Sequence, residues 1–281
     1  MIEQQSAPVR HFPDRDRLSI VTAVILLAYA LARFAELPSR EFSATLLGSS
    51  IGVELNGQFI ILLMVAALIS TGSDTLIRSH PRFEHRILGA LSHWTLPGSA
   101  ALVLGLLLNL APLGPVWWLG LGLSALLLVI VLVAEYTVVD QADPAFQAAA
   151  FGLTALTFIM ALAIFGWIRF TGTRAALSAT STALVAGLLA LRLFVLNRAS
   201  FQRGLMFAGV IGLVCGEAMW ALNYWRVTPV GAGLLLLVIF YVLHGLAQQH
   251  LTGQITRRVI VEFAVVGVVG GMIGLSLAWP R

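Results

Sequence analysis

Nine stretches of mostly apolar residues, each about 20 residues long, fill almost the whole 281-residue chain. A helix of this length crosses the hydrocarbon core of a bilayer. A water-soluble chain of the same size could not bury so much apolar surface, because the buried fraction rises only slowly with length. The sequence therefore predicts an all-α integral membrane protein with about nine transmembrane helices in one bundle. The expected ranges are residues 18–37, 57–76, 88–111, 115–138, 145–169, 174–196, 204–225, 229–250 and 257–279.

The domain organisation follows from the same pattern. Residues 1–17 are polar and are expected to form a cytoplasmic tail, and residues 18–279 a single transmembrane domain. Two prolines and a glycine at 112–115 break one long apolar run into the third and fourth helices, although eight crossings remain an alternative to nine. The longest connection, residues 38–56, is expected to lie on the outer membrane surface, where Leu46, Leu47, Ile51 and Val53 would contact lipid.

Arginine supplies every basic side chain, since the sequence has no lysine. With a cytoplasmic N-terminus, ten arginines fall in cytoplasmic segments and five in outer segments. Basic residues are enriched on the cytoplasmic side of membrane proteins. The distribution therefore predicts a cytoplasmic N-terminus and, after nine crossings, an outer C-terminus.

Composition excludes several classes of protein. A retinal protein, a pyridoxal phosphate enzyme and a phosphate-loop NTPase each need a lysine. The single cysteine, Cys215, excludes an internal disulfide and a cysteine-based metal or iron–sulfur site. The zinc-hydrolase motif HExxH does not occur, and the sequence assigns no catalytic residue and no metal site. The net charge of +4 reflects topology rather than affinity for nucleic acid.

The last apolar stretch contains two overlapping GxxxG spacings. Glycines four residues apart let two helix backbones approach closely. The spacing predicts close packing within this chain, with homodimerisation as the alternative. The glycines concerned are Gly267, Gly270, Gly271 and Gly274.

Ionisable side chains inside membrane helices are costly, so each is a candidate functional residue. Asp74 and Glu262 each have an arginine four residues away, Arg78 and Arg258, and an ion pair on the helix surface is the alternative interpretation. Arg192 has no acidic residue one turn away. Its alternative is an extended side chain that reaches the membrane surface.

Two histidines are expected at similar depth in the cytoplasmic half of the bundle. His93 precedes Pro97, which leaves a backbone carbonyl of the helix without its usual partner. His244 shares one helix face with Tyr241 and Gln248, at spacings of three and four residues. His93 and His244 could hold a ligand, and haem b between the two imidazoles is one possibility. Packing histidines with hydrogen bonds are the alternative.

Glu217 is the most costly of these residues, because it falls near the middle of its helix with no basic residue within a turn. Trp220 and Tyr224 share its face. A carboxyl group at this depth suits proton coupling or cation binding. We expect Asp74, His93, Arg192, His244 and Glu262 to converge in the cytoplasmic half, with Glu217 deeper along the same interior.

Several stretches resemble an uncharacterised family of bacterial polytopic membrane proteins, mainly from Chloroflexi. They are residues 72–75, residues 78–81, His93-Trp94 with Pro97, Glu217 with residues 220–222, and residues 241–250. The resemblance implies a polytopic membrane protein and supplies no catalytic residues.

Three functions fit the sequence. The first is a transporter or binding protein for a small solute, an ion or a lipid in a bacterial inner membrane, using the intramembrane ionisable groups. The second is a structural subunit or assembly factor of a membrane complex, in contact with partners through the last helix. The third, an enzyme or redox protein with haem between His93 and His244, is the least favoured. The bilayer itself is the one partner that the composition requires.

Overall fold

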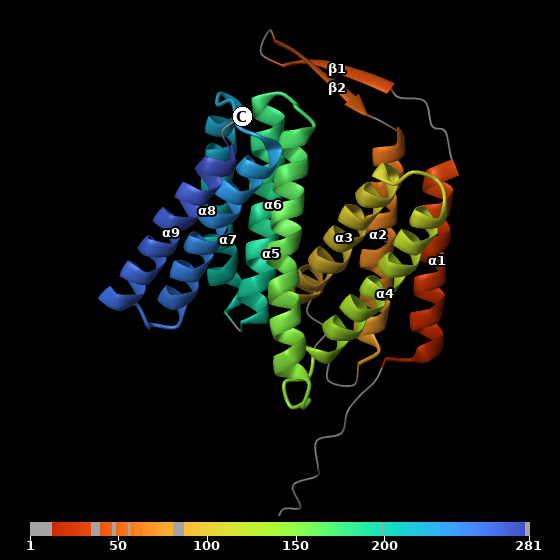
Figure 1. Ribbon diagram of the computed structural model, residues 1–281. Helices are drawn as coiled ribbons and strands as arrows, with labels where there is room; N and C mark the ends of the chain where they lie inside the picture. The colour runs from red at the N-terminus through yellow and green to blue at the C-terminus, as the bar shows by residue number, and fades with distance from the viewer. Residues whose placement is uncertain are drawn as a thin grey trace, which may run out of the picture. The chain divides into compact units, whose positions relative to one another are not determined.

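The computed structural model describes residues 13–34, 40–46, 49–55, 57–80, 87–197 and 199–278 (Figure 1). Side chains are described outside residues 40–55 and 87–91. Most of the polar tail expected at residues 1–17 lies outside the described residues. The chain forms two compact units: unit 1 comprises residues 1–85 and 96–149, and unit 2 comprises residues 86–95 and 150–281.

The described residues contain nine helices that are long and apolar enough to cross a membrane, which confirms the number predicted from the sequence. Their length and composition indicate a membrane-embedded, multi-pass protein. The helices are α1 (Arg15–Phe34), α2 (Gly57–Arg78), α3 (Ile87–Leu110), α4 (Pro115–Thr137), α5 (Phe146–Phe170), α6 (Ala175–Leu196), α7 (Phe201–Asn223), α8 (Pro229–Leu251) and α9 (Arg257–Ala278).

The break that separates α3 from α4 lies where the two prolines and the glycine predict it. Gly114 has a φ of 155°, which disfavours residues with a side chain. Pro115 follows as the first residue of α4. A backbone N–H at this position would have no partner within the helix, so proline is tolerated there. This turn makes two helices out of one apolar run.

A two-stranded antiparallel sheet lies between α1 and α2 in the sequence, and it was not predicted. Strand β1 (Arg40–Leu46) pairs with β2 (Ser49–Leu55), from Arg40 opposite Leu55 to Leu46 opposite Ser49. Apolar residues alternate with polar or small ones in both strands, which is the period of a β-strand. Residues 48–52 match the letters GxSxG, but the middle serine lies within β2, whereas a serine nucleophile needs a strand-to-helix turn.

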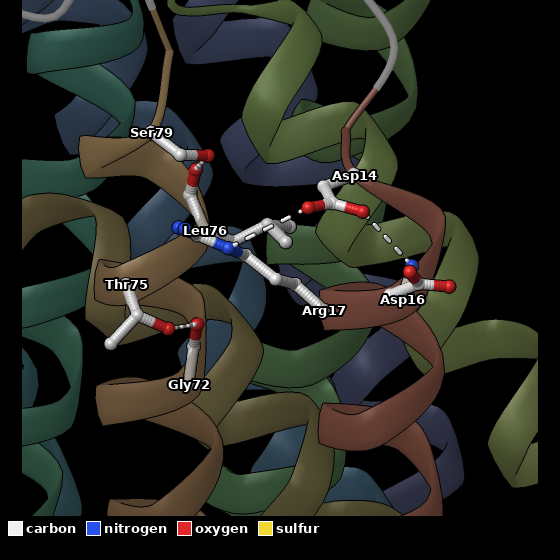
Figure 2. Close-up of polar contacts among 7 residues, drawn as sticks. All are labelled: Asp14, Asp16, Arg17, Gly72, Thr75, Leu76 and Ser79. Atoms are coloured by element: carbon white, nitrogen blue, oxygen red, sulfur yellow. Dashed lines mark hydrogen bonds and ion pairs between the residues drawn. The ribbon is translucent and has the colours of Figure 1, made fainter.

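Helix α1 begins in polar residues, three positions earlier than the apolar pattern predicts. The Asp14 carboxylate accepts a hydrogen bond from the backbone N–H of Asp16 at 3.0 Å. The same carboxylate lies 3.7 Å from Nε of Arg17 (Figure 2). An aspartate before the first turn satisfies an N–H that has no partner within the helix. Polar capping therefore extends α1 beyond its apolar stretch.

Close approach of helices organises unit 1. The phenol of Tyr29 on α1 donates a buried hydrogen bond of 2.6 Å to the carbonyl oxygen of Ala101 on α3. A β-carbon at Gly105 would collide with Leu62 of α2, and one at Gly98 would lie 2.6 Å from the hydroxyl of Ser70. Glycine at these two positions of α3 therefore allows α2 to pack closely against it.

Helices α6 and α7 of unit 2 meet backbone to backbone. A β-carbon at Gly212 would lie 2.5 Å from the carbonyl oxygen of Ala183, and one at Gly216 would lie 2.9 Å from that of Ala179. Small residues recur every four positions on both helices. Such lines of small residues let membrane helices pack closely through van der Waals contact. They are Ala179, Ala183 and Gly187 on α6, and Gly204, Ala208, Gly212 and Gly216 on α7.

Helix α9 packs on α8 through one face (Figure 1). β-Carbons at Gly270 and Gly274 would each lie 2.8 Å from α8, against Val238 and Leu235, and one at Gly267 would lie 3.5 Å from Val242. A β-carbon at Gly271 would have no atom of another element within 4 Å, so this glycine is not packed against α8. Three of the four glycines predicted to pack are thus placed against a helix of this chain.

Candidate functional site

His244 lies in the core of unit 2, with only 6% of its surface exposed. Phenylalanine rings from three helices surround the imidazole. Phe194 of α6 lies nearest, with ring centroids 4.6 Å apart, Phe240 stacks at 6.2 Å, and Phe158 of α5 lies at 6.5 Å. The Nδ1 atom is buried and has no hydrogen-bond partner among the described residues. A polar group is therefore held in a pocket of aromatic side chains.

The predicted polar stripe on α8 divides between this core and the surface. Gln248, one turn after His244, is half-buried, and its Oε1 likewise lacks a partner within the described part of the chain. Tyr241 is 40% exposed and packs against Phe158 of α5 and Phe263 of α9. His244 and Gln248 therefore belong to one site, and Tyr241 borders it.

Arg192 of α6 is only 1% exposed and lies in the core of unit 2. The alternative of an extended side chain that reaches the membrane surface is therefore wrong. Its helix neighbours Leu191, Leu193 and Phe194 belong to the main apolar core of the unit. A buried guanidinium requires nearby oxygen acceptors, so Arg192 adds charge and polarity to the interior that also holds His244.

Glu217 is exposed, and the expectation that it lies in the interior is wrong. Trp220 and Tyr224 do share its face of α7, and they are 47% and 75% exposed. The line of small residues at Gly212 and Gly216 turns the opposite face of α7 toward α6, so this polar face points outward. Glu217 also lies six residues from the end of α7, roughly 9 Å along the axis at 1.5 Å per residue.

Two further candidates form the surface ion pairs that the sequence offered as an alternative. Nε of Arg78 lies 2.6 Å from the carboxylate of Asp74 on α2. The equivalent distance between Arg258 and Glu262 on α9 is 3.1 Å, with both side chains more than half exposed. Because Glu262 is exposed, it does not join His244 in the interior of unit 2.

Two hydroxyl groups near Asp74, those of Thr75 and Ser79, bond to carbonyl oxygens of their own helix (Figure 2). The buried hydroxyl of Ser73 has no hydrogen-bond partner among the described residues. Thr75 donates to the carbonyl oxygen of Gly72 at 2.8 Å, and Ser79 donates to that of Leu76 at 2.6 Å. Hydroxyls that bond back to the preceding turn are commonly structural. The hydrogen atoms of these two hydroxyls are therefore used within α2, and only their oxygen lone pairs remain available.

His93 is half-buried in the first turns of α3, within the part of that helix that belongs to unit 2. Helix α3 continues through Pro97 to Leu110. Asp74 belongs to unit 1, whereas His93, Arg192 and His244 belong to unit 2. Of the expected cluster, Arg192 and His244 are both buried within unit 2, on α6 and α8.

The sequence missed a second group of buried polar residues, in unit 1. Glu135 is fully buried at the end of α4. The next residue, Tyr136, packs edge-on against His80 with ring centroids 4.7 Å apart, and both are 4% exposed. Asp140 is 5% exposed in the following turn. Three of these four residues, Glu135, Tyr136 and Asp140, fall within six positions, and this clustering was the signal available in the sequence.

Metal binding would need several ligands close together. Among the residues that the structure describes, no group of three or more histidine, cysteine, aspartate or glutamate side chains is placed to hold a metal ion. The single cysteine, Cys215, is a buried member of the apolar core of unit 2.

Comparison with known proteins gives a family and no activity. No curated protein and no solved structure matches the chain. Residues 37–276 match the family described as "Protein of unknown function (DUF5656)". This range takes in the hairpin, α2 to α8 and nearly all of α9, so both candidate groups of buried polar residues lie within it. The expected resemblance to an uncharacterised family is confirmed at that level, and the chain belongs to the DUF5656 family.

Proposed function

We propose that this protein binds a small solute, an ion or a lipid inside unit 2 and carries it across a bacterial inner membrane. In this proposal the nine helices cross the bilayer with the N-terminus in the cytoplasm and the C-terminus outside. The observation that supports it most is the buried imidazole of His244, whose Nδ1 has no hydrogen-bond partner among the described residues.

The energetics favour a ligand at this place. A buried polar group without a partner costs about 1–3 kcal/mol of stability. His244 and Gln248 carry two such atoms one helical turn apart, beside the rings of Phe158, Phe194 and Phe240. Ligand sites are commonly apolar with a few polar groups that fix orientation. Since Nδ1 can donate or accept and Oε1 accepts, the site suits a small molecule with a hydrogen-bond donor.

The test is native mass spectrometry of the full chain purified in mild detergent. A small-molecule mass should be retained by the wild type and lost from His244→Leu and Gln248→Leu. His250→Leu is the matched control, because His250 lies on the same helix but is exposed. A bound mass that survives both core substitutions would place the ligand elsewhere and contradict the proposed site.

A stability measurement separates binding from a structural role of the same residues. If His244 serves a ligand, His244→Leu should leave the ligand-free protein as stable or stabilise it by up to about 2 kcal/mol, because the unpaired polar atom is removed. Unfolding at a lower denaturant concentration than the wild type would show that the imidazole makes structural hydrogen bonds, and would count against the proposal.

A membrane redox protein with haem b held by His93 and His244 is the second candidate. Both histidines belong to unit 2, and Nδ1 of His244 has no hydrogen-bond partner among the described residues. Haem iron accepts imidazole nitrogens as axial ligands. A haem mass, together with visible haem absorbance that both His93→Leu and His244→Leu abolish, would select this function. A co-purifying protein in the same spectrum would instead select the subunit or assembly function.

Glu217 enters the proposal as the group that couples transport to protons or binds a cation. Glu217 lies on the exposed face of α7 and not in the core of unit 2. The proposed role therefore requires that protons or cations reach this face of α7. Indole and phenol side chains such as Trp220 and Tyr224 are typical of the boundary between lipid and water, where a carboxyl group can exchange protons. The coupling role is therefore tested separately from the His244 site.

A further inference from the structure

An apolar groove lies on the surface of unit 1 between α3 and α4. Its volume is about 440 Å³, and every lining residue except Ser124 is apolar or glycine. The Ser124 hydroxyl donates to the carbonyl oxygen of Gly120 at 2.8 Å. That hydroxyl is therefore satisfied within its helix, and the groove presents hydrocarbon along its length.

The shape of the groove suits a chain rather than a compact solute. On α4 it extends from Val116 to Ile130, which is roughly 21 Å at 1.5 Å per residue. This exceeds the half-thickness of a bilayer's hydrocarbon core, about 15 Å. Leu107 and Leu123 on its walls are 57% and 67% exposed. The groove is thus open along its side, as a site filled from the surrounding lipid needs to be.

A positive charge lies at one end of the groove. The guanidinium of Arg33, in the last turn of α1, donates to the carbonyl oxygens of Asn109 and Ala111, each at 3.4 Å. Ala111 itself lines the groove. Within the described part of the chain, Arg33 has no acidic partner, and its buried Nε has no hydrogen-bond partner. No acidic side chain among the described residues therefore neutralises this charge.

The start of α4 adds to this positive end. Pro115 is its first residue. The capping position before it is Gly114, so no side chain there accepts a hydrogen bond from the first turn of the helix. The N-terminus of a helix carries a partial positive charge and favours anions. Val116, in the first turn, lines the groove. An uncapped helix start and an arginine thus flank the same end of an apolar groove.

We propose that this groove binds one phospholipid with an anionic headgroup. One acyl chain occupies the groove between α3 and α4, and the headgroup phosphate lies against Arg33 and the start of α4. Charge complementarity favours this occupant over a second copy of the chain, since an apolar helix in the groove would bring no anion to Arg33, whose described partners are two carbonyl oxygens. The site lies in unit 1, apart from the site proposed around His244.

Lipid titration followed by native mass spectrometry tests the proposal on the full-length chain. The probes are phosphatidylglycerol and phosphatidylcholine with identical acyl chains, with inorganic phosphate as competitor. Arg33→Gln removes the charge, and Gly120→Leu fills the groove. Arg169→Gln is the matched arginine control, because Arg169 also donates to a carbonyl oxygen, that of Trp225 at 3.3 Å, and has a buried Nε without a partner among the described residues. Gly122→Leu is the matched glycine control, because a β-carbon at Gly122 meets open space.

The wild type should bind one phosphatidylglycerol about fivefold more tightly than phosphatidylcholine, which corresponds to about 1 kcal/mol for one arginine near the membrane surface. Arg33→Gln should abolish this preference, and Gly120→Leu should weaken both lipids, while the two controls change neither. If Gly120→Leu does not fold, Val116→Trp blocks the groove from an exposed position.

Four results would overturn the proposal. Equal binding of the two lipids by the wild type would remove the headgroup contact. An equal loss in Arg169→Gln would mean that any arginine near the membrane surface attracts the lipid. A dimer mass that Gly120→Leu converts to monomer would make the groove an interface between copies. Competition by inorganic phosphate as strong as that by phosphatidylglycerol would assign the site to free phosphate instead.

Discussion

Replacement of Gly212 by alanine tests whether backbone contact between α6 and α7 stabilises unit 2. The added β-carbon would lie 2.5 Å from the carbonyl oxygen of Ala183 and 3.3 Å from the backbone of Gly187. Backbone atoms cannot rotate away as a side chain can, so the helices must separate by roughly 1 Å to reach van der Waals distance. Overpacking of this kind costs about 1–3 kcal/mol, which is roughly 5- to 140-fold in the unfolding equilibrium constant.

Gly209→Ala is the control for the change in helix propensity. It lies on the same helix, and no atom of another element lies within 4 Å of a β-carbon there. Alanine is the better helix former by up to about 1 kcal/mol, so this variant should be neutral or slightly stabilised. The assay is reversible unfolding in mixed micelles of dodecyl maltoside and dodecyl sulfate, followed by circular dichroism. Unfolding of both variants at the same dodecyl sulfate fraction would refute the backbone contact.

Three other substitutions probe single interactions. Tyr29→Phe removes the buried 2.6 Å hydrogen bond to Ala101 and should lower the free energy of unfolding by about 1 kcal/mol in the same titration; an unchanged midpoint would show that the bond adds no stability. Arg78→Gln breaks a partly exposed ion pair with Asp74 and should change the free energy by less than about 0.5 kcal/mol, so a loss above that would contradict the assignment as a surface pair. Glu217→Gln should leave stability unchanged within about 0.5 kcal/mol and should abolish the proton dependence of transport in proteoliposomes, whereas unchanged proton dependence would remove its coupling role.

The number of helices was predictable because lipid imposes one length on every helix that crosses it. The turn between α3 and α4 was predictable for a local reason, since two prolines and a glycine at 112–115 leave no continuous helix. The hairpin was not predicted, although β1 and β2 alternate in the period of a strand. The apolar residues of segment 38–56 fit a loop that lies on the membrane surface equally well. The pairing of two strands also depends on both strands together, so neither strand predicts it alone.

Depth along a helix was easier to predict than rotation about its axis. Distance from the helix end follows from counting, whereas rotation depends on which face packs against a neighbour. Glu217 and His244 were both placed inside from their depth. The structure places His244 in the core and Glu217 on the surface. Depth alone therefore could not separate a core residue from an exposed one.

Small residues explain the rotation of α7 better than polar ones. In a water-soluble protein, the polar face of a helix points outward because water solvates it. Lipid does not solvate polar side chains in this way, so that preference is absent in a membrane. The sequence reasoning accordingly placed the polar face of Glu217, Trp220 and Tyr224 inward. Close packing acts on the other face, where Gly212 and Gly216 admit the backbone of α6. A line of small residues four apart was as visible in α7 as in α9, and it determines which side of α7 is buried.

Buried charge was predicted least well, for a related reason. Arg192 was expected inside, with an extended side chain that reaches the membrane surface as the alternative, and it is 1% exposed. Glu135 was not among the candidate residues, and it is 0% exposed. An extended side chain avoids the cost of burial only where lipid or water surrounds the helix end. Here most residues at the ends of α4 and α6 are buried, so these ionisable groups stay inside and must be balanced there. Arg192 and Glu135 thus place buried ionisable groups near helix ends rather than at mid-helix, and the transport path that we propose would have to use them.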